Sequence, residues 1–283
     1  MDFSKRLQIC GIASAQTSAR PPFYPQNRIP CLPRSEPFSI KSKEMPKNPI
    51  ANARALAALN ARIIACNRCE RLRAYCLEVA QTRRRAYLDC AYWGRPVPSF
   101  GDPQARVLII GLAPGAHGSN RTGRPFTGDG SGNFLYPVLY DAGYASQPRA
   151  TSREDGMRLH DLWITSVVRC APPGNKPLPQ ELANCAPFLD EEISALSNLR
   201  VVVCLGKIGF DGFTQHLLRT KKIPRRAALK FAHGAEYALP NGLTLLASYH
   251  PSLQNTNTGK LTPAMFLAIF RRARQIAQAS SPS

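Results

Sequence analysis

The sequence contains no long apolar run, and this absence excludes one large class of proteins. Nowhere in the 283 residues do about 18 apolar residues follow one another without interruption, the length that a transmembrane helix needs. The first residues also lack the apolar segment of a secretory signal. The sequence therefore predicts a protein that neither spans a membrane nor is secreted, and we expect it in the cytoplasm.

Acidic residues are scarce. The chain has 18 Asp and Glu against 37 Lys and Arg, which gives a formal net charge of +19. A globular chain this basic needs a polyanionic partner or an anionic surface, and phosphate contacts are made mainly by Lys and Arg. The composition favours a nucleic acid as the partner.

Nine cysteines occur without a secretory signal, which argues against a disulfide framework and for ligation of a metal or cluster. Cys66 and Cys69 form a C-x2-C pair at the end of a predicted helix. Cys170 and Cys185 flank strand-to-helix connections far downstream. Four thiolates suit a zinc ion or an iron–sulfur cluster.

The other cysteines leave alternatives open. Cys76 and Cys90 are rival ligands, whereas Cys204 lies inside a predicted strand, where a buried free thiol is the ordinary interpretation.

The pattern of apolar residues predicts two regions. Residues 1–48 are rich in proline and basic residues and show no apolar periodicity, which is typical of a flexible tail. Residues 49–283 alternate strand and helix patterns and are predicted to form a single domain. Strands are expected at 107–110, 162–168, 201–205 and 243–247, and helices at 52–64, 133–144, 181–196 and 263–279. This alternation predicts a doubly wound α/β fold with a mainly parallel four-stranded sheet flanked by helices.

A glycine-rich loop follows the first predicted strand, from residue 111 to 129. Such a loop lets backbone N–H groups approach a ligand, and ligands of open α/β sheets bind at the carboxyl ends of strands. Phe126, Asp129, His117, Arg121 and Arg124 in this loop suit a planar heterocycle attached to a phosphate backbone. A nucleotide-phosphate loop is the alternative, but the glycine spacing fits neither a P-loop nor a dinucleotide fingerprint.

His250 follows the last predicted strand and is expected at the same edge of the sheet. A histidine there can donate a hydrogen bond to a ligand oxygen or to a departing anion. The polar residues 254–258 beside it favour a ligand site over a histidine that merely ends a strand.

Four segments together resemble the uracil-DNA glycosylase superfamily, and within it family 5, the type B iron–sulfur enzymes. They are GLAPGAHGSNRTGRPFTGDGSG (111–132), VRCAPPGNKPLP (168–179), the predicted helix with Cys185, and SYHPSLQNTNTGKLT (248–262). With Cys66 and Cys69 the resemblance spans about residues 52–275. It implies a uracil-DNA glycosylase-like fold and hydrolysis of the N-glycosidic bond of a damaged base in DNA, which begins base excision repair. It also implies a structural 4Fe–4S cluster.

The resemblance assigns roles to individual residues. The catalytic or base-contacting residues it implies are Asp129, Asn175 and His250. The base-binding residues are Gly111, Leu112, Ala113, Gly115 and Phe126, with Phe126 stacking on a flipped base. The cluster ligands are Cys66, Cys69, Cys170 and Cys185. The DNA contacts that we expect come from His117, Arg121, Arg124, Ser252, Leu253, Asn255 and Lys260, with Leu253 as the wedge.

Ala113 sets this chain apart from many members of the superfamily, which carry Asp or Asn there; family 5 has alanine. We therefore expect activity beyond uracil, including hypoxanthine, on double- and single-stranded DNA. Gly115 and Leu253 also differ from the Ala and Gln that the family usually carries. No lysine lies in a motif that would make it a Schiff-base nucleophile, so a monofunctional enzyme is predicted.

Two alternatives remain at this point: a non-catalytic iron–sulfur or zinc module that binds nucleic acid, and a family 4-like enzyme restricted to uracil. We further expect a monomer that is associated with the bacterial nucleoid.

Overall fold

The computed structural model describes residues 49–225 and 229–279, which belong to one compact unit, Met45–Ser283. The tail predicted at residues 1–48 lies outside the described residues. No helix in the described ranges is long and apolar enough to cross a membrane.

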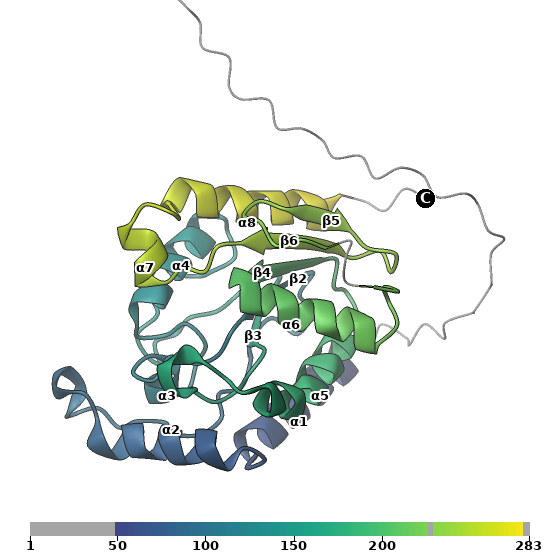
Figure 1. Ribbon diagram of the computed structural model, residues 1–283. Coiled ribbons are helices and arrows are strands. Elements are labelled where there is room, and N and C mark those ends of the chain that lie inside the picture. Colours follow the sequence, from purple (N-terminus) through teal and green to yellow (C-terminus); the bar gives the residue numbers. More distant parts are fainter. Residues whose placement is uncertain (1–48, 226–228, 280–283) are drawn as a thin grey trace, which may run out of the picture. The chain divides into compact units, whose positions relative to one another are not determined.

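Four parallel strands form the centre of the sheet (Figure 1). They are β2 (Val107–Gly111), β3 (Leu162–Ser166), β4 (Val201–Leu205) and β6 (Thr244–Ser248). Their β-branched and leucine residues fit strands that are covered on both faces. All four were predicted from such short apolar runs.

The sheet has six strands, which corrects the prediction of four. Its order is β1-β3-β2-β4-β6-β5, and the two additional strands are antiparallel to their neighbours. β1 (Phe100–Gly101) has two residues and β5 (Glu236–Ala238) has three. Strands this short at the edges of a sheet carry no readable alternation, so the sequence gives no signal for them.

Helices cover both faces of the sheet (Figure 1). One core cluster contains Leu108 and Ile110 of β2 with side chains of α1 (Pro49–Ile64), α5 (Pro179–Ala195) and α6 (Gly206–Arg219). The other contains Val107 and Ile109 with side chains of α4 (Gly130–Asp141) and α8 (Pro263–Gln278). Because neighbouring side chains of a strand point to opposite faces, one apolar strand supplies both cores. The predicted doubly wound arrangement is confirmed.

The remaining elements are short or lie outside the two layers. They are α2 (Glu70–Thr82), the 3-10 helices η1 (Arg85–Tyr87) and η2 (Pro173–Asn175), α3 (Ser119–Thr122) and α7 (Leu253–Asn257). α3 and α7 follow the carboxyl ends of β2 and β6, and η2 follows β3. The loops that carry the predicted functional residues are thereby brought to one edge of the sheet.

Candidate active site

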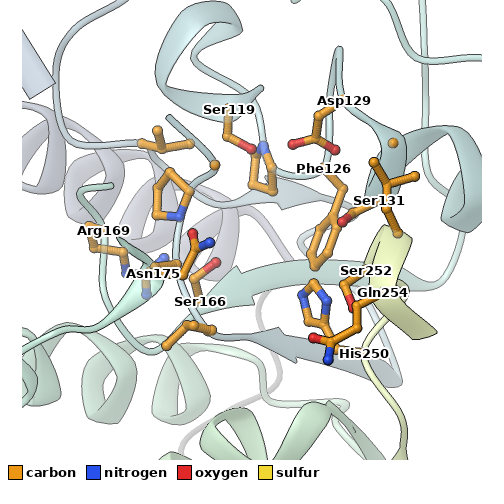
Figure 2. A pocket seen from close by; sticks show the side chains of 18 of the residues that line it. Ser119, Phe126, Asp129, Ser131, Ser166, Arg169, Asn175, His250, Ser252 and Gln254 are labelled. Carbon is orange, nitrogen blue, oxygen red and sulfur yellow. The ribbon is translucent and has the colours of Figure 1, made fainter. Parts of the chain in front are cut away.

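A cavity of about 550 Å³ lies at the carboxyl edge of the sheet (Figure 2). Segments after β2, β3 and β6 form it, with a fourth segment that precedes β1. Nine of the predicted residues line this cavity: Leu112, Ala113, Gly115, Phe126, Asp129, Asn175, His250, Ser252 and Leu253. A volume of this size accommodates a nucleobase with part of its sugar.

Phe126 has a backbone conformation that is rare for an aromatic residue, with φ at 50°. Its ring lies against Gly111, where an added Cβ would be 2.9 Å from Phe126 Cζ. Gly111 does not line the cavity itself; it leaves space for the aromatic ring that does. Strained residues of this kind persist where the surrounding structure holds them in place, and they cluster at binding sites.

His250 lies next to Phe126 in Figure 2, with ring centroids 5.9 Å apart and planes tilted by 34°. Burial lowers the pKa of His250 to about 4, so the imidazole is neutral at neutral pH. A neutral imidazole still carries one N–H and can donate it to a ligand oxygen. The backbone carbonyl of His250 accepts a hydrogen bond from Asn255 Nδ2 at 2.8 Å. Asn255 therefore holds the histidine backbone and is not among the residues that line the cavity.

Asp129 caps α4, and its Oδ1 accepts a hydrogen bond from the backbone N–H of Gly132 at 2.9 Å. Burial raises the pKa of Asp129. Its other oxygen, Oδ2, lies over Gly115 and Gly118, where an added Cβ would be 2.9 Å and 1.9 Å away. The two glycines thus leave the space that the carboxylate occupies.

Ser166 and Arg169 line the cavity and were missed in the sequence. Both are buried and follow from β3, whose carboxyl end meets that of β2. Arg169 Nη2 donates to Glu192 Oε2 at 2.7 Å, and the two side chains are 2% and 0% exposed. The signal for Arg169 was its place directly after the strand predicted at 162–168, whereas Ser166 lies inside that predicted strand and ends β3.

Asn175, Ser252 and Leu253 lie at the rim of the cavity. Asn175 is exposed, has a φ of 58°, and lies near Ser166 and Arg169 in Figure 2. Leu253 is 58% exposed and packs over Gly130. An exposed leucine at the rim of a cavity has the position that a wedge into a base stack requires.

Arg124 does not contact the cavity or solvent, which corrects its assignment as a phosphate contact. Its side chain is 4% exposed and donates from Nη1 and Nη2 to both oxygens of Asp155, at 2.8 Å and 2.6 Å. A buried bidentate ion pair of this kind fixes the loop. Asp155 lies 31 residues away in the sequence, and no pattern there indicated the pairing.

Arg121 also has an internal role. Its guanidinium donates to the carbonyl oxygens of His117 and Gly128 and lies 4.0 Å over the ring of Tyr87. His117 Nδ1 lies 3.0 Å from Tyr92 Oη, and burial lowers the pKa of His117. Neither residue lines the cavity.

Lys260 is exposed, and its Nζ lies 4.7 Å over the ring of Tyr249. It does not line the cavity, so a contact with DNA outside the pocket stays a prediction for this residue.

Three of the four predicted ligand cysteines, Cys69, Cys170 and Cys185, pack in one cluster. Cys66 lies two residues after α1. Burial raises the pKa of Cys69, and the charge of Cys66 makes a smaller contribution. Burial raises the pKa of Cys185 to about 12, with a smaller contribution from Cys170 and Cys69 nearby. Cys76 adds a fifth thiol to this cluster, and its Sγ donates to the carbonyl oxygen of Ala171, the residue after Cys170, at 3.6 Å. In the described ranges, no three His, Cys, Asp or Glu side chains are arranged to hold a single metal ion.

The α/β fold and the pocket at the carboxyl edge of its sheet can be compared with those of known proteins. The sequence model of the uracil DNA glycosylase superfamily matches residues 98–274. The chain belongs to this superfamily.

Relatives within the superfamily place the chain more closely. A type-5 uracil-DNA glycosylase from Thermus thermophilus is 51% identical over 215 residues, which span 76% of this chain and 95% of the relative. One from Mycobacterium tuberculosis is 46% identical over 226 residues, or 80% of this chain and 83% of the relative. A type-4 uracil-DNA glycosylase from Thermotoga maritima is only 29% identical over 54% of this chain and 67% of its own length. The predicted resemblance to family 5 is confirmed.

Proposed function

We propose that this chain excises uracil from DNA by hydrolysing the N-glycosidic bond between the base and deoxyribose. The observation that carries the proposal is the convergence of Phe126, Asp129 and His250 on one cavity, in a chain that is about half identical to a type-5 uracil-DNA glycosylase. A module that only binds nucleic acid has no need of this convergence, which weighs against that alternative.

The base must first leave the duplex, because residues that line a pocket cannot reach a base that is stacked inside the double helix. Flipping a base out of the stack costs a few kcal/mol, and least at a mismatched or damaged pair. Stacking on Phe126 offsets about 1–3 kcal/mol of that cost. Leu253 at the rim has the exposure to fill the gap that the base leaves.

Bond cleavage sends the electron pair of the N-glycosidic bond onto the base, which departs as an anion. His250, neutral at pH 7, donates its N–H to a base carbonyl oxygen as this charge develops. Asn175, at the mouth, has an amide that can hydrogen-bond to the base edge.

Asp129 is proposed to act at the sugar. Its carboxylate stabilises the positive charge that develops on deoxyribose and orients a water molecule. The water oxygen forms the new bond to C1′, and its proton passes to the carboxylate. The free base and an abasic sugar are the products.

The substrate range is proposed to extend beyond uracil to deaminated purines such as hypoxanthine. Ala113 presents only a methyl group to a cavity of about 550 Å³, where a carboxylate or amide would narrow the choice of base. A purified-protein assay on duplexes with one lesion each, read for rate and released base, tests this. Release of uracil alone would contradict the wider range, and release of no base would contradict the glycosylase itself.

A monofunctional mechanism is proposed because no lysine lies among the described residues that line the cavity. The product is then an intact strand with an abasic site. Strand cleavage without added alkali, lost on substitution of a single lysine, would contradict this.

We further propose that Cys66, Cys69, Cys170 and Cys185 hold a structural 4Fe–4S cluster. The support is the chemistry of the donor set, because four thiols from the end of α1, the start of α2, the segment after β3 and α5 gather in one region. A cubane cluster is larger than one ion, so its ligands need not surround a single point. The cluster would join these four segments of the chain.

We also propose that the enzyme is a monomer and that it acts on chromosomal DNA in a bacterial cytoplasm.

A further inference from the structure

We propose that five exposed arginines beside the pocket form a second DNA contact, which binds phosphates next to the damaged nucleotide. These residues are Arg83, Arg84, Arg85, Arg95 and Arg153, and we name them the arginine ledge. The inference rests on the proposed function, because it takes DNA as the substrate. It goes beyond that function in assigning a binding role to residues outside the cavity.

The ledge has charge without acidic partners. None of its five arginines forms an ion pair with any residue in the described part of the chain. By contrast, the exposed Arg62 pairs with Glu191 and the exposed Arg272 pairs with Glu236.

Three acidic residues, Asp89, Glu154 and Asp155, lie near the ledge in sequence. Asp155 pairs with the buried Arg124, and the other two form no ion pair within the described ranges. Exposed arginines that no carboxylate neutralises are the groups that phosphates contact.

Aromatic rings hold part of the ledge in place. The guanidinium of Arg153 lies 4.4 Å from the Trp93 ring centroid, and that of Arg95 lies 5.7 Å from it. Trp93 also packs against Gly123, where an added Cβ would be 2.8 Å from the indole. Arginines that already lie over a ring lose less rotamer freedom when they bind an anion.

The ledge is joined directly to the loop that forms the pocket. The backbone N–H of Trp93 donates to the carbonyl oxygen of Arg121 at 2.8 Å, and that of Gly94 donates to Asn120 at 3.0 Å. Tyr92 Oη bridges the backbone N–H of Arg84, at 3.4 Å, and His117 Nδ1, at 3.0 Å.

The same segment continues from the ledge into the cavity wall at Val97 and Pro98. A nucleotide in the cavity therefore has the ledge beside it along the loop.

Figure 1 shows the ledge's first part, after α2, and the wedge-bearing α7 on the same side of the molecule. DNA carries a phosphate about every 3.4 Å along each strand, so a duplex seated over the cavity continues past its rim on both sides. The ledge is the basic surface that meets it on the side of α2.

The test compares salt dependence in the full chain. The probe is a duplex of about 25 base pairs with one stable abasic-site analogue, and binding is followed by fluorescence anisotropy between about 50 and 200 mM salt. The variant is Arg84→Ala with Arg85→Ala. The matched control is Arg62→Ala with Arg272→Ala, which removes the same charge from arginines that already have carboxylate partners.

We expect the ledge variant to bind several-fold more weakly and its slope of log K against log salt to shrink by about 1–2, since each lost phosphate contact contributes about 0.9. The control should keep the wild-type slope. Arg84→Lys with Arg85→Lys should restore the wild-type slope. This result would show that the lost positive charge, and not a change of shape or a loss of folding, causes the weaker binding.

An unchanged slope in the ledge variant, or an equal loss in the control, would overturn the inference. Uracil release by the wild-type protein is measured beside these experiments. Its absence would count against the proposed function, whereas uracil release with an unaltered slope would count against the ledge alone.

Discussion

Asp129 Oδ2 occupies the space directly over Gly118, where a Cβ would lie only 1.9 Å from it. The same oxygen lies 2.9 Å from the Cβ position of Gly115. The proposed catalytic carboxylate therefore depends on two glycines that do not react themselves. Glycine is required here for the absence of a side chain, because Gly118 has a φ of −100°.

Gly118→Ala is expected to displace the carboxylate and to reduce excision about 100-fold or more, a range typical for loss of a positioned acid–base group. Gly115→Ala should have a smaller effect, since its contact is less severe. Single-turnover excision of uracil measures both.

Gly242→Ala serves as the control for those two variants. Gly242 has a φ of 82°, and a Cβ added there would have no surrounding atom within 4 Å. Alanine there should cost about 1–2 kcal/mol of stability from backbone strain and leave excision unchanged. Equal activity in Gly118→Ala and the wild type would remove Asp129 from the proposed chemistry.

The pH dependence of His250 follows from its depressed pKa. Burial lowers this pKa to about 4, whereas an unfolded histidine titrates near 6.5. As the pH falls from about 6.5 to 4, the unfolded chain binds a proton that the folded chain does not. The free energy of unfolding should therefore fall over that window, by up to about 3 kcal/mol from this residue.

Denaturant unfolding of the wild type and of His250→Gln at several pH values isolates this contribution. The other histidines contribute equally to both proteins, so the difference between the two free energies of unfolding reports His250 alone. Excision by the wild type should show no titration near pH 6.5, since the donor stays neutral well below it. An activity loss with a midpoint near 6.5 would contradict the role of neutral His250.

The sequence predicted most of the fold because its central strands are short, buried and strongly apolar. Val201–Leu205 has the predicted bounds, β2 runs one residue beyond its prediction, and β6 is shifted by one residue at both ends. The edge strand at Phe100 escaped prediction because two residues have no periodicity.

The pocket was predictable only where its residues follow strands. Leu112, Phe126 and His250 were found in this way, and Arg169 could have been found by the same rule. Val97 could not, because its segment reaches the cavity through tertiary hydrogen bonds, among them its own N–H to the carbonyl oxygen of Arg169 at 2.7 Å. Arg124 was misassigned because its charge is neutralised by a distant Asp155.

Arg169, which lines the pocket, forms a buried ion pair with Glu192, and Trp163 Nε1 donates to Glu192 Oε1 at 2.9 Å. Glu192→Gln leaves the guanidinium buried without a counter-charge, so it should cost about 3–5 kcal/mol of stability. Glu236→Gln, which breaks the exposed pair with Arg272, should cost less than about 1 kcal/mol. Urea denaturation of the two variants checks this difference. Equal losses of stability in the two variants would mean that burial does not determine how much each ion pair contributes to stability.

The proposed cluster predicts different outcomes for two buried cysteines. Cys185→Ser should abolish the visible absorption of a thiolate-bound iron cluster and the bound iron and sulfide, and it should lower the thermal unfolding temperature. Cys204, fully buried in β4 and away from the other thiols, is the control. Cys204→Ala should keep the absorption, the iron and the sulfide.

Cys76 provides the sharper distinction, because its thiol packs in the same buried cluster as Cys170 and Cys185 and is a rival to the four proposed ligands. If Cys66, Cys69, Cys170 and Cys185 are the ligands, Cys76→Ala retains four irons per chain and the same spectrum. Loss of iron in Cys76→Ala but not in Cys66→Ala would move Cys76 into the ligand set. Zinc in place of iron in anaerobically purified protein would contradict the cluster itself, since both metals accept thiolate ligands.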